Sequence, residues 1–158
     1  MPFDVPRRRG DKPRTTTENP HMQLDQKPED ASVRAELARQ VFALVDVEEQ
    51  PSGISVPGAR ALCLAPSAPT GPASAFMIGR EFAHLHPHPD MSLHLTLPEE
   101  LGEEAVAAGW AELHPVARMG AIPPTAFMVF APRDDEEREV VCGLVAASHA
   151  FARGTTPA

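Results

Sequence analysis

Histidine is the residue type in this chain best suited to chemistry near neutral pH, and four histidines fall at positions that can meet. They are His84, His86, His94 and His114. A neutral imidazole can accept a proton or bind a transition metal. His84 and His86 are separated by one residue, so in a strand their side chains share one face. We therefore predict that the four histidines converge on one polar site.

A β-hairpin is needed to bring His94 to the same place. Apolar and polar residues alternate in residues 75–86 and 92–97, around the turn sequence Pro87-His88-Pro89-Asp90. In the register that pairs His84 with His94, the leucines gather on the opposite face. A slip of one residue would place His94 among those leucines, so burial favours the first register. The hairpin then gathers three imidazoles in one patch.

Several charged residues near the hairpin extend this prediction. Arg80 should join the histidine face and hold an anion, whereas Glu81 should fall on the leucine side. A carboxylate there must be paired, have a raised pKa, or reach solvent at the strand end. Arg133 either faces the site or bridges to a nearby glutamate. The remaining histidines, at positions 21, 88 and 149, lie outside the pattern, and we expect no role for them.

The elements around the hairpin predict an α+β domain. Helical spacing follows Asp30 and should end near residues 48–51, a second helix runs from Pro98 to Gly109, and a third follows Asp134 with Glu137 as a capping box. Short apolar runs at 52–64 and 126–131 indicate strands. We expect an antiparallel sheet of about four to six strands, with a histidine-bearing hairpin, packed by three helices. Residues 1–29 should be a disordered arm, 30–152 one domain, and 153–158 a flexible tail.

Charge and composition exclude several classes of function. The formal net charge is −8, and all of the excess acid lies after residue 27, because residues 1–27 hold more Arg and Lys than Asp and Glu. An acidic body is unsuited to a phosphate backbone, so we expect no nucleic-acid partner. No run of residues has the ~20 apolar positions that span a bilayer. Cys63 and Cys142 form no redox or metal motif. We therefore expect a cytoplasmic protein without a membrane partner and with free thiols, of undetermined oligomeric state.

Five separate segments, in order, resemble one known family, the luciferase domain of the fungal bioluminescence enzymes and of small bacterial proteins related to them. The resemblance covers roughly residues 75–150. The matching segments are Arg80-Glu81-Phe82-Ala83-His84-Leu85-His86, Asp90-Met91-Ser92-Leu93-His94-Leu95-Thr96-Leu97, Gly109-Trp110 with His114-Pro115-Val116-Ala117, Pro123-Pro124-Thr125, and Phe130-Ala131-Pro132-Arg133. The motif positions occupied by candidate catalytic residues are His84, His86, His94, His114, Arg80, Glu81, Asp90 and Arg133.

The resemblance implies oxygen chemistry on a small molecule. The fungal enzymes add dioxygen to a hydroxylated styryl-pyrone (hydroxyhispidin), and the resulting peroxide loses carbon dioxide. By likeness, this chain would be an oxidoreductase, an oxygenase of enolic, hydroxypyrone or phenolic compounds, with dioxygen as co-substrate and no required cofactor. His84 or His94 would be the base, His86 and His114 would position the substrate, and Arg80 or Arg133 would hold the anion. The fungal enzymes also carry an N-terminal membrane anchor that has no counterpart among these residues.

Two other hypotheses remain open. His84, His86 and His94 could bind iron or zinc, because His-x-His followed by Asp90 is close to the first half of a cupin motif. The second half of that motif is missing after residue 100. Alternatively, the domain could bind a small molecule without turnover, since resemblance in fold does not prove catalysis.

Overall fold

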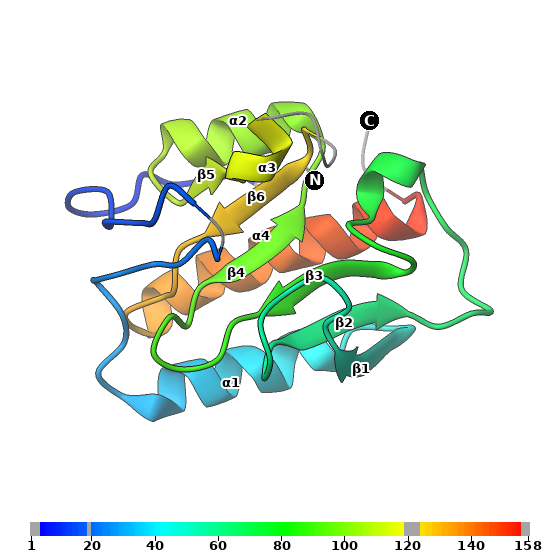
Figure 1. Cartoon of the computed structure of the whole chain (residues 1–158), viewed down its shortest axis with the longest axis horizontal. Helices are drawn as coiled ribbons and strands as arrows, with labels where there is room; N and C mark the ends of the chain where they lie inside the picture. Colours follow the sequence, from blue (N-terminus) through cyan, green and yellow to red (C-terminus); the bar gives the residue numbers. More distant parts are fainter. Residues whose placement is uncertain (1–3, 19, 119–123, 156–158) are drawn as a thin grey trace.

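A six-stranded antiparallel sheet is the centre of the fold. The computed structural model describes residues 4–18, 20–118 and 124–155. In this part of the chain the strand order is β1-β2-β3-β4-β6-β5, and every neighbouring pair is antiparallel (Figure 1). The strands are β1 (Val47–Pro51), β2 (Arg60–Leu64), β3 (Glu81–Leu85), β4 (Leu93–Thr96), β5 (Ala111–Leu113) and β6 (Ala126–Val129). The predicted α+β class and sheet size are confirmed.

Three helices of nine or more residues pack on this sheet within the described residues. They are α1 (Ala31–Phe42), α2 (Glu99–Ala107) and α4 (Asp135–Arg153), with a short α3 (Pro115–Arg118) and a 3-10 turn at Ala73–Ala75. Helices α1 and α4 contact each other and cover one face of the sheet (Figure 1). The core between these helices and the sheet contains the buried leucines of the central strands, Leu62, Leu64, Leu85, Leu93 and Leu95. The opposite face is left for polar side chains.

The helix ends follow from their capping residues. Asp30 accepts a hydrogen bond from the Ser32 backbone N–H at the start of α1, and Asp134 accepts one from Glu137 at the start of α4. The carboxylate of Glu137 accepts from the backbone N–H of Arg133, so the capping box is only half formed. Helix α4 ends at Gly154, whose φ of +74° lies in the left-handed region that glycine tolerates.

The first helix is shorter than predicted. It ends at Phe42, and residues 47–51 form edge strand β1 instead of its last turn. Val45, which helical spacing assigned to the apolar stripe, is 58% exposed. Asp46 has φ of +64° and turns the chain into the strand. The strand was missed because most of its side chains are exposed, so it carries no apolar alternation.

The expected disorder of residues 1–29 does not hold for the described part of that segment. Residues 14–16 pair with residues 22–24 as a small hairpin, which includes a bridge between Thr15 and Gln23. Gln23 is buried, and its Oε1 accepts a hydrogen bond from the Ala131 backbone N–H. Arg8 and His21 are also buried. These polar side chains hold the segment in place by hydrogen bonds to groups that are distant in the sequence. Composition alone does not reveal such contacts. Of the predicted tail, Arg153 belongs to α4 and residues 156–158 lie outside the described residues.

Candidate active site

The histidine-bearing hairpin forms in the predicted register. His84 on β3 pairs with His94 on β4, and their leucine neighbours pair as Leu85 with Leu93. The next strand places Met128 beside His94, and β5 places Glu112 beside Met128. The side chains of this row lie on the face opposite α1 and α4. Four adjacent strands, β3, β4, β6 and β5, therefore carry this row of side chains.

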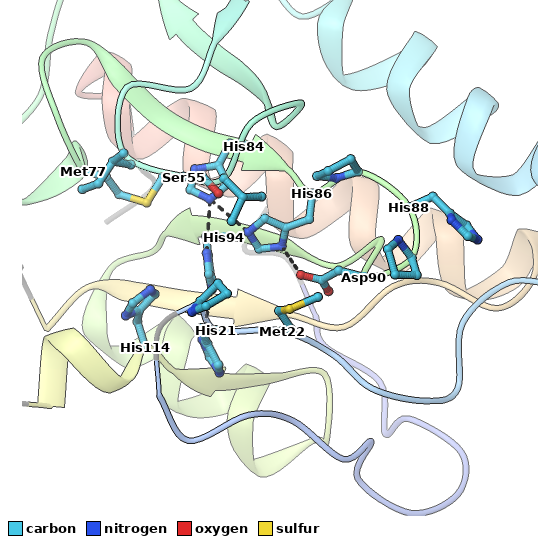
Figure 2. Close-up of a pocket in the computed structure, with 15 residues that line it drawn as sticks. His21, Met22, Ser55, Met77, His84, His86, His88, Asp90, His94 and His114 are labelled. Carbon is cyan, nitrogen blue, oxygen red and sulfur yellow. Dashed lines mark hydrogen bonds and ion pairs between the residues drawn. The ribbon is translucent and has the colours of Figure 1, made fainter.

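Three imidazoles meet at their ring nitrogens (Figure 2). The Nε2 atom of His84 lies 3.2 Å from His86 Nε2 and 3.1 Å from His94 Nδ1. Each of the three side chains belongs to a residue that is at most 4% exposed. We call His84, His86 and His94 the inner trio.

Two further histidines contact His94 from its other side. The ring of His114, which follows β5, lies 4.4 Å from the ring of His94 between centroids. His21 comes from the N-terminal hairpin, stacks on His94 at 5.1 Å, and places its Nδ1 3.0 Å from His94 Nε2. The prediction of convergence for His114 is confirmed, whereas the prediction that His21 plays no part in the cluster is wrong. Its segment has no periodicity that could have signalled this position.

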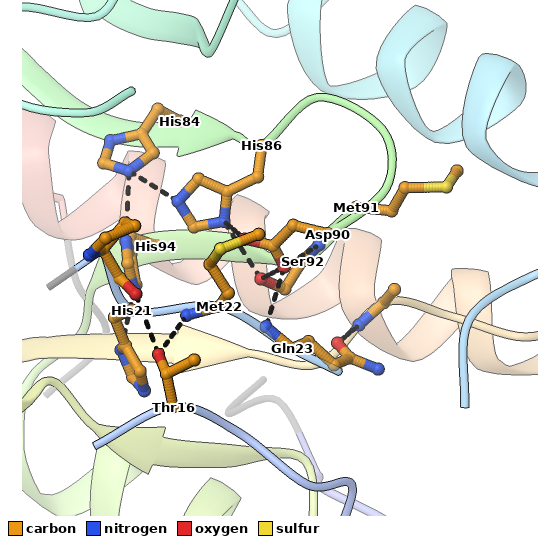
Figure 3. A network of polar contacts seen from close by, with 12 residues as sticks. Thr16, His21, Met22, Gln23, His84, His86, Asp90, Met91, Ser92 and His94 are labelled. Carbon is orange, nitrogen blue, oxygen red and sulfur yellow. Dashed lines mark hydrogen bonds and ion pairs between the residues drawn. The ribbon is translucent and has the colours of Figure 1, made fainter. Parts of the chain in front are cut away.

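Carboxylates lie behind three of these rings. Glu81 Oε2 is 2.8 Å from His84 Nδ1, and Asp90 Oδ2 is 3.1 Å from His86 Nδ1. Asp90 also accepts hydrogen bonds from the Ser92 hydroxyl and the Gln23 backbone N–H (Figure 3). Glu112 Oε1 is 3.1 Å from His21 Nε2. Sequence reasoning missed Glu112, because no local pattern in β5 indicates that its partner is His21, 91 positions earlier in the chain.

Glu81 lies on the histidine face, contrary to the prediction that it joins the leucines. The register between β2 and β3 shifts between Leu62 and Cys63, which pair with Ala83 and Glu81. Phe82 is thus an extra residue in β3, a β-bulge, and its ring packs in the core. Because of the bulge, the side chains that precede Ala83 in β3 point to the faces opposite to those that strict alternation gives them. Strict period-two reasoning could not place Glu81 correctly.

Burial and hydrogen bonding set the charge states of the cluster. Burial lowers the pKa of His84 below its ordinary value and that of His94 well below it, and it lowers the pKa of His114 to about 4. Burial opposes ionisation of Glu81 and Asp90, but hydrogen bonds from His84 and His86 and from their other partners outweigh it, so both pKa values are lowered. Near pH 7 these imidazoles are neutral and these carboxylates are ionised.

A cavity of about 640 Å³ opens over the cluster (Figure 2). Its polar floor includes the inner trio, His21, His114 and Asp90. Its walls are largely apolar and include Ile54, Val56, Met77, Met22 and Pro87. A cavity of this size, with apolar walls and a few convergent polar groups, suits a small organic ligand.

Comparison with known proteins identifies the domain. Residues 79–148 match the family model described as Luciferase domain. This stretch of the chain is similar to a luciferase domain. It is 33% identical over 159 residues to proteins named luciferase in Armillaria ostoyae and in Armillaria gallica, over 92% of this chain. It is 44% identical over 71 residues to a luciferase of Neonothopanus nambi, covering 44% of this chain and 27% of that protein. No solved structure matches the chain.

The chain spans 60% of the length of each of these two Armillaria proteins. Of the helices in the described ranges, none combines the length and apolarity required to cross a membrane.

Two arginines on the luciferase motif lie outside the histidine cluster. The Arg80 guanidinium donates to the backbone carbonyls of Leu64, Ala65 and Ala68, so it holds the loop after β2. The Arg133 guanidinium pairs with Glu137 at the start of α4 and donates to the Arg9 carbonyl. Of the two alternatives for Arg133, the bridge to a glutamate is thus the one observed. Neither guanidinium lines the cavity as described.

Five other residues that stand out in the sequence have simpler placements. His88 is exposed at the cavity rim, and His149 lies on α4, where its Nε2 contacts the Val45 carbonyl. Trp110 is buried in the core and its indole donates to the Pro6 carbonyl. Cys63 and Cys142 are free thiols. Apart from His21, no histidine that was predicted to lie outside the cluster enters it.

Proposed function

We propose that this luciferase-domain protein is an oxygenase that adds dioxygen to an enolic, hydroxypyrone or phenolic small molecule at the histidine cluster. The observation that carries this proposal is the set of neutral, buried imidazoles at the floor of a cavity large enough for such a substrate. The relation to fungal luciferases supports the same class of chemistry.

The first chemical step would be loss of the enol proton. We assign the role of acceptor to one of two imidazoles that line the cavity: His84, whose Nδ1 is held by Glu81, or His114, which is half-buried. An imidazole held by a carboxylate keeps one tautomer and orientation, as in hydrolase triads. General-base assistance of this kind typically contributes about 10²–10⁴-fold to the rate. Loss of the proton yields an enolate, the electron-rich form that reacts with oxygen.

The second step would join oxygen to carbon. The enolate carbon gives two electrons to dioxygen, a carbon–oxygen bond forms, and dioxygen is reduced to a peroxide. The substrate carbon is oxidised by the same two electrons, and the proton taken by the imidazole returns to the outer peroxide oxygen. Atoms and charge balance without another reductant. The apolar walls at Ile54, Val56 and Met77 would hold a flat ring in place.

Oxygen uptake tests this proposal. The purified chain is supplied with a panel of hydroxypyrones, enols and catechols, and dioxygen consumption is followed together with peroxide or product mass. We expect uptake with at least one substrate, reduced about 10²-fold or more in His114→Ala and in His84→Ala. His88→Ala is the matched control, because His88 lies at the exposed rim. No uptake on any member of the panel would contradict the oxygenase.

A binding protein without turnover is the competing function. Tight binding of a pyrone or flavonoid with no oxygen consumed and no change in ligand mass would favour it. Equilibrium dialysis with mass analysis of the recovered ligand separates the two outcomes.

A further inference from the structure

The nitrogen–nitrogen contacts inside the histidine cluster need more hydrogens than rings with one proton each can supply. There are three such contacts: His84 with His86, His84 with His94, and His94 with His21, at 3.0–3.2 Å. At these distances two ring nitrogens that both present lone pairs repel each other, so each contact requires a proton or another cation between its atoms.

The outer nitrogens of three rings are already committed. An ionised carboxylate only accepts hydrogen bonds, so His84 Nδ1 carries its proton toward Glu81 and His21 Nε2 carries its proton toward Glu112. The Ser92 hydroxyl donates to Asp90, so it accepts from His86 Nδ1, which therefore also carries its proton outward. Each of these rings then presents a lone pair to the inside of the cluster.

His94 alone can supply an inner proton, and it has one in the neutral form. That proton can serve the contact with His21 or the contact with His84. It cannot serve both, and the contact between His84 and His86 is left without any. One further proton would still leave one of the three contacts without a hydrogen. Two extra protons would place two positive imidazolium rings against each other in a buried cluster.

We propose that the inner trio binds one divalent transition-metal ion of the zinc or iron(II) class. His84 Nε2, His86 Nε2 and His94 Nδ1 would be its ligands, and the fourth position would open to the cavity (Figure 2). The ion satisfies both contacts of His84, and the proton of His94 then lies on Nε2 and is donated to His21 Nδ1. All three contacts are accounted for by one ion.

The distances fit such an ion. With metal–nitrogen bonds of about 2.0–2.1 Å, two ligands of a tetrahedral ion lie about 3.3–3.4 Å apart. The two distances from His84 Nε2 are 3.1 and 3.2 Å, so a small outward shift completes the site. Imidazole ligands suit zinc and iron, and three protein ligands with one open position are typical of a catalytic centre.

The surroundings of the trio also match a metal site. Metal-binding histidines commonly donate their other ring N–H to a carboxylate, which fixes their orientation. Glu81 stands behind His84, Asp90 behind His86, and His21 with Glu112 behind His94. Among the described residues no Lys or Arg forms an ion pair with Glu81 or Asp90, although both are at most 4% exposed. A dication nearby would balance these buried negative charges.

A second set of three histidines, His21, His94 and His114, also lies within metal-binding reach. We place the ion in the inner trio because the contact between His84 and His86 lies there, and an ion in the second set would leave that contact without a proton or cation. Occupancy of the second set would also use His94 Nε2, which in the proposed arrangement donates its proton to His21. The two sets therefore make different predictions for His114 variants.

The inference concerns the same site as the proposed oxygenase and depends on that function only for its chemical consequence. With His84 Nε2 bound to the ion, the ion would balance the negative charge of an enolate, and His114 would be the remaining proton acceptor. Metal binding itself is measured without any substrate, so it can fail while oxygen uptake succeeds, and the reverse.

Titration of the full chain tests the site. Protein treated with a chelator and then dialysed is titrated with Co²⁺ and with Zn²⁺, followed by visible absorption and by calorimetry. We expect one equivalent per chain and the intense visible bands of four-coordinate Co²⁺. His84→Ala and His86→Ala should lose this binding, whereas His114→Ala and His88→Ala should keep it. Glu81→Gln, which keeps all three ligands, should weaken the affinity about 10–100-fold.

Circular dichroism and thermal unfolding show whether each variant is folded, and Glu81→Gln keeps the test informative if an alanine variant is not. Absence of binding to the parent chain would overturn the inference. So would affinity that is unchanged in His84→Ala and His86→Ala. Loss in His114→Ala with retention in His84→Ala would overturn it as well, because the ion would then belong to the second set.

Discussion

Asp90 joins three parts of the site through one carboxylate. Its Oδ1 accepts from the Ser92 hydroxyl at 2.6 Å and from the Gln23 backbone N–H at 3.0 Å, and its Oδ2 lies 3.1 Å from His86 Nδ1. It therefore orients an inner-trio ring and anchors the N-terminal hairpin. In the cupin-like hypothesis Asp90 belonged to the motif that begins with the two histidines of β3. In the structure its carboxylate contacts the outer nitrogen of His86, not the nitrogen that faces His84.

Substitution of Asp90 by asparagine should weaken the site without unfolding the chain. An amide is neutral and presents one acceptor oxygen, so it cannot hold both His86 and Ser92 as the carboxylate does. Loss of such an outer partner typically costs about 10–100-fold in metal affinity or activity. Cobalt titration and oxygen uptake measure the effect. His88→Ala, two positions away, should change neither, and an Asp90→Asn protein with parental affinity would contradict the role given to this carboxylate.

The start of α4 shows how an element is held in place. The Glu137 carboxylate is 3% exposed and accepts from the Arg133 guanidinium and backbone N–H. Burial raises the pKa of Glu137, but these hydrogen bonds outweigh it and the pKa lies below its ordinary value. A carboxyl group whose pKa is lower in the folded state stabilises the fold above its unfolded pKa, and this contribution is lost as the pH falls through the folded value.

Glu137→Gln should therefore lower the free energy of unfolding at pH 7 by about 1–3 kcal/mol, because hydrogen bonds to a buried charged group are lost. The difference from the parent should narrow as the pH is lowered from about 5 to below the folded pKa of the carboxyl group. Urea unfolding across this pH range checks both statements. Glu136→Gln removes an equal charge from the same helix turn at an exposed position. A difference in the free energy of unfolding between Glu137→Gln and the parent that did not change with pH would contradict the lowered pKa of Glu137.

At the scale of the whole molecule, the N-terminal hairpin closes the polar face of the sheet. It carries His21 to the cluster and Gln23 to the backbone of Ala131, and it lies on the side of the sheet opposite α1 and α4 (Figures 1 and 3). The two faces of the sheet are thus covered in different ways. One is covered by the apolar sides of α1 and α4, and the other is partly covered by hydrogen-bonded polar side chains.

Gln23→Ala should loosen this cover. The change leaves the Ala131 N–H without its partner, and a buried unsatisfied group costs about 1–3 kcal/mol. We expect lower stability in urea and faster tryptic cleavage after the exposed Arg14 under native conditions. Thr17→Ala, at an exposed position in the same hairpin, should leave both unchanged. Cleavage at the parental rate in Gln23→Ala would show that this side chain does not hold the hairpin.

Sequence reasoning reached the parts of the molecule that local patterns govern. The pairing of His84 with His94 could be predicted because a slipped register would bury a histidine among leucines. The same reasoning failed for Glu81, where an extra residue in the strand reverses the faces. It also failed for His21 and Glu112, which meet across 91 positions through polar contacts that have no period. Apolar periodicity indicates which residues form a core. It gives little information on this site, because polar groups make most of its contacts.

The bulge at Phe82 makes the link between Glu81 and His84 depend on chain length rather than on residue identity. No single substitution can move a carboxylate from one face of a strand to the other, but insertion or deletion of one residue does so in a single event. A relative lacking this extra position would keep every histidine aligned and still leave the first imidazole without its acidic neighbour. Among relatives with the same histidines, a gap at this point of the strand therefore indicates altered chemistry that the histidine positions alone would not show.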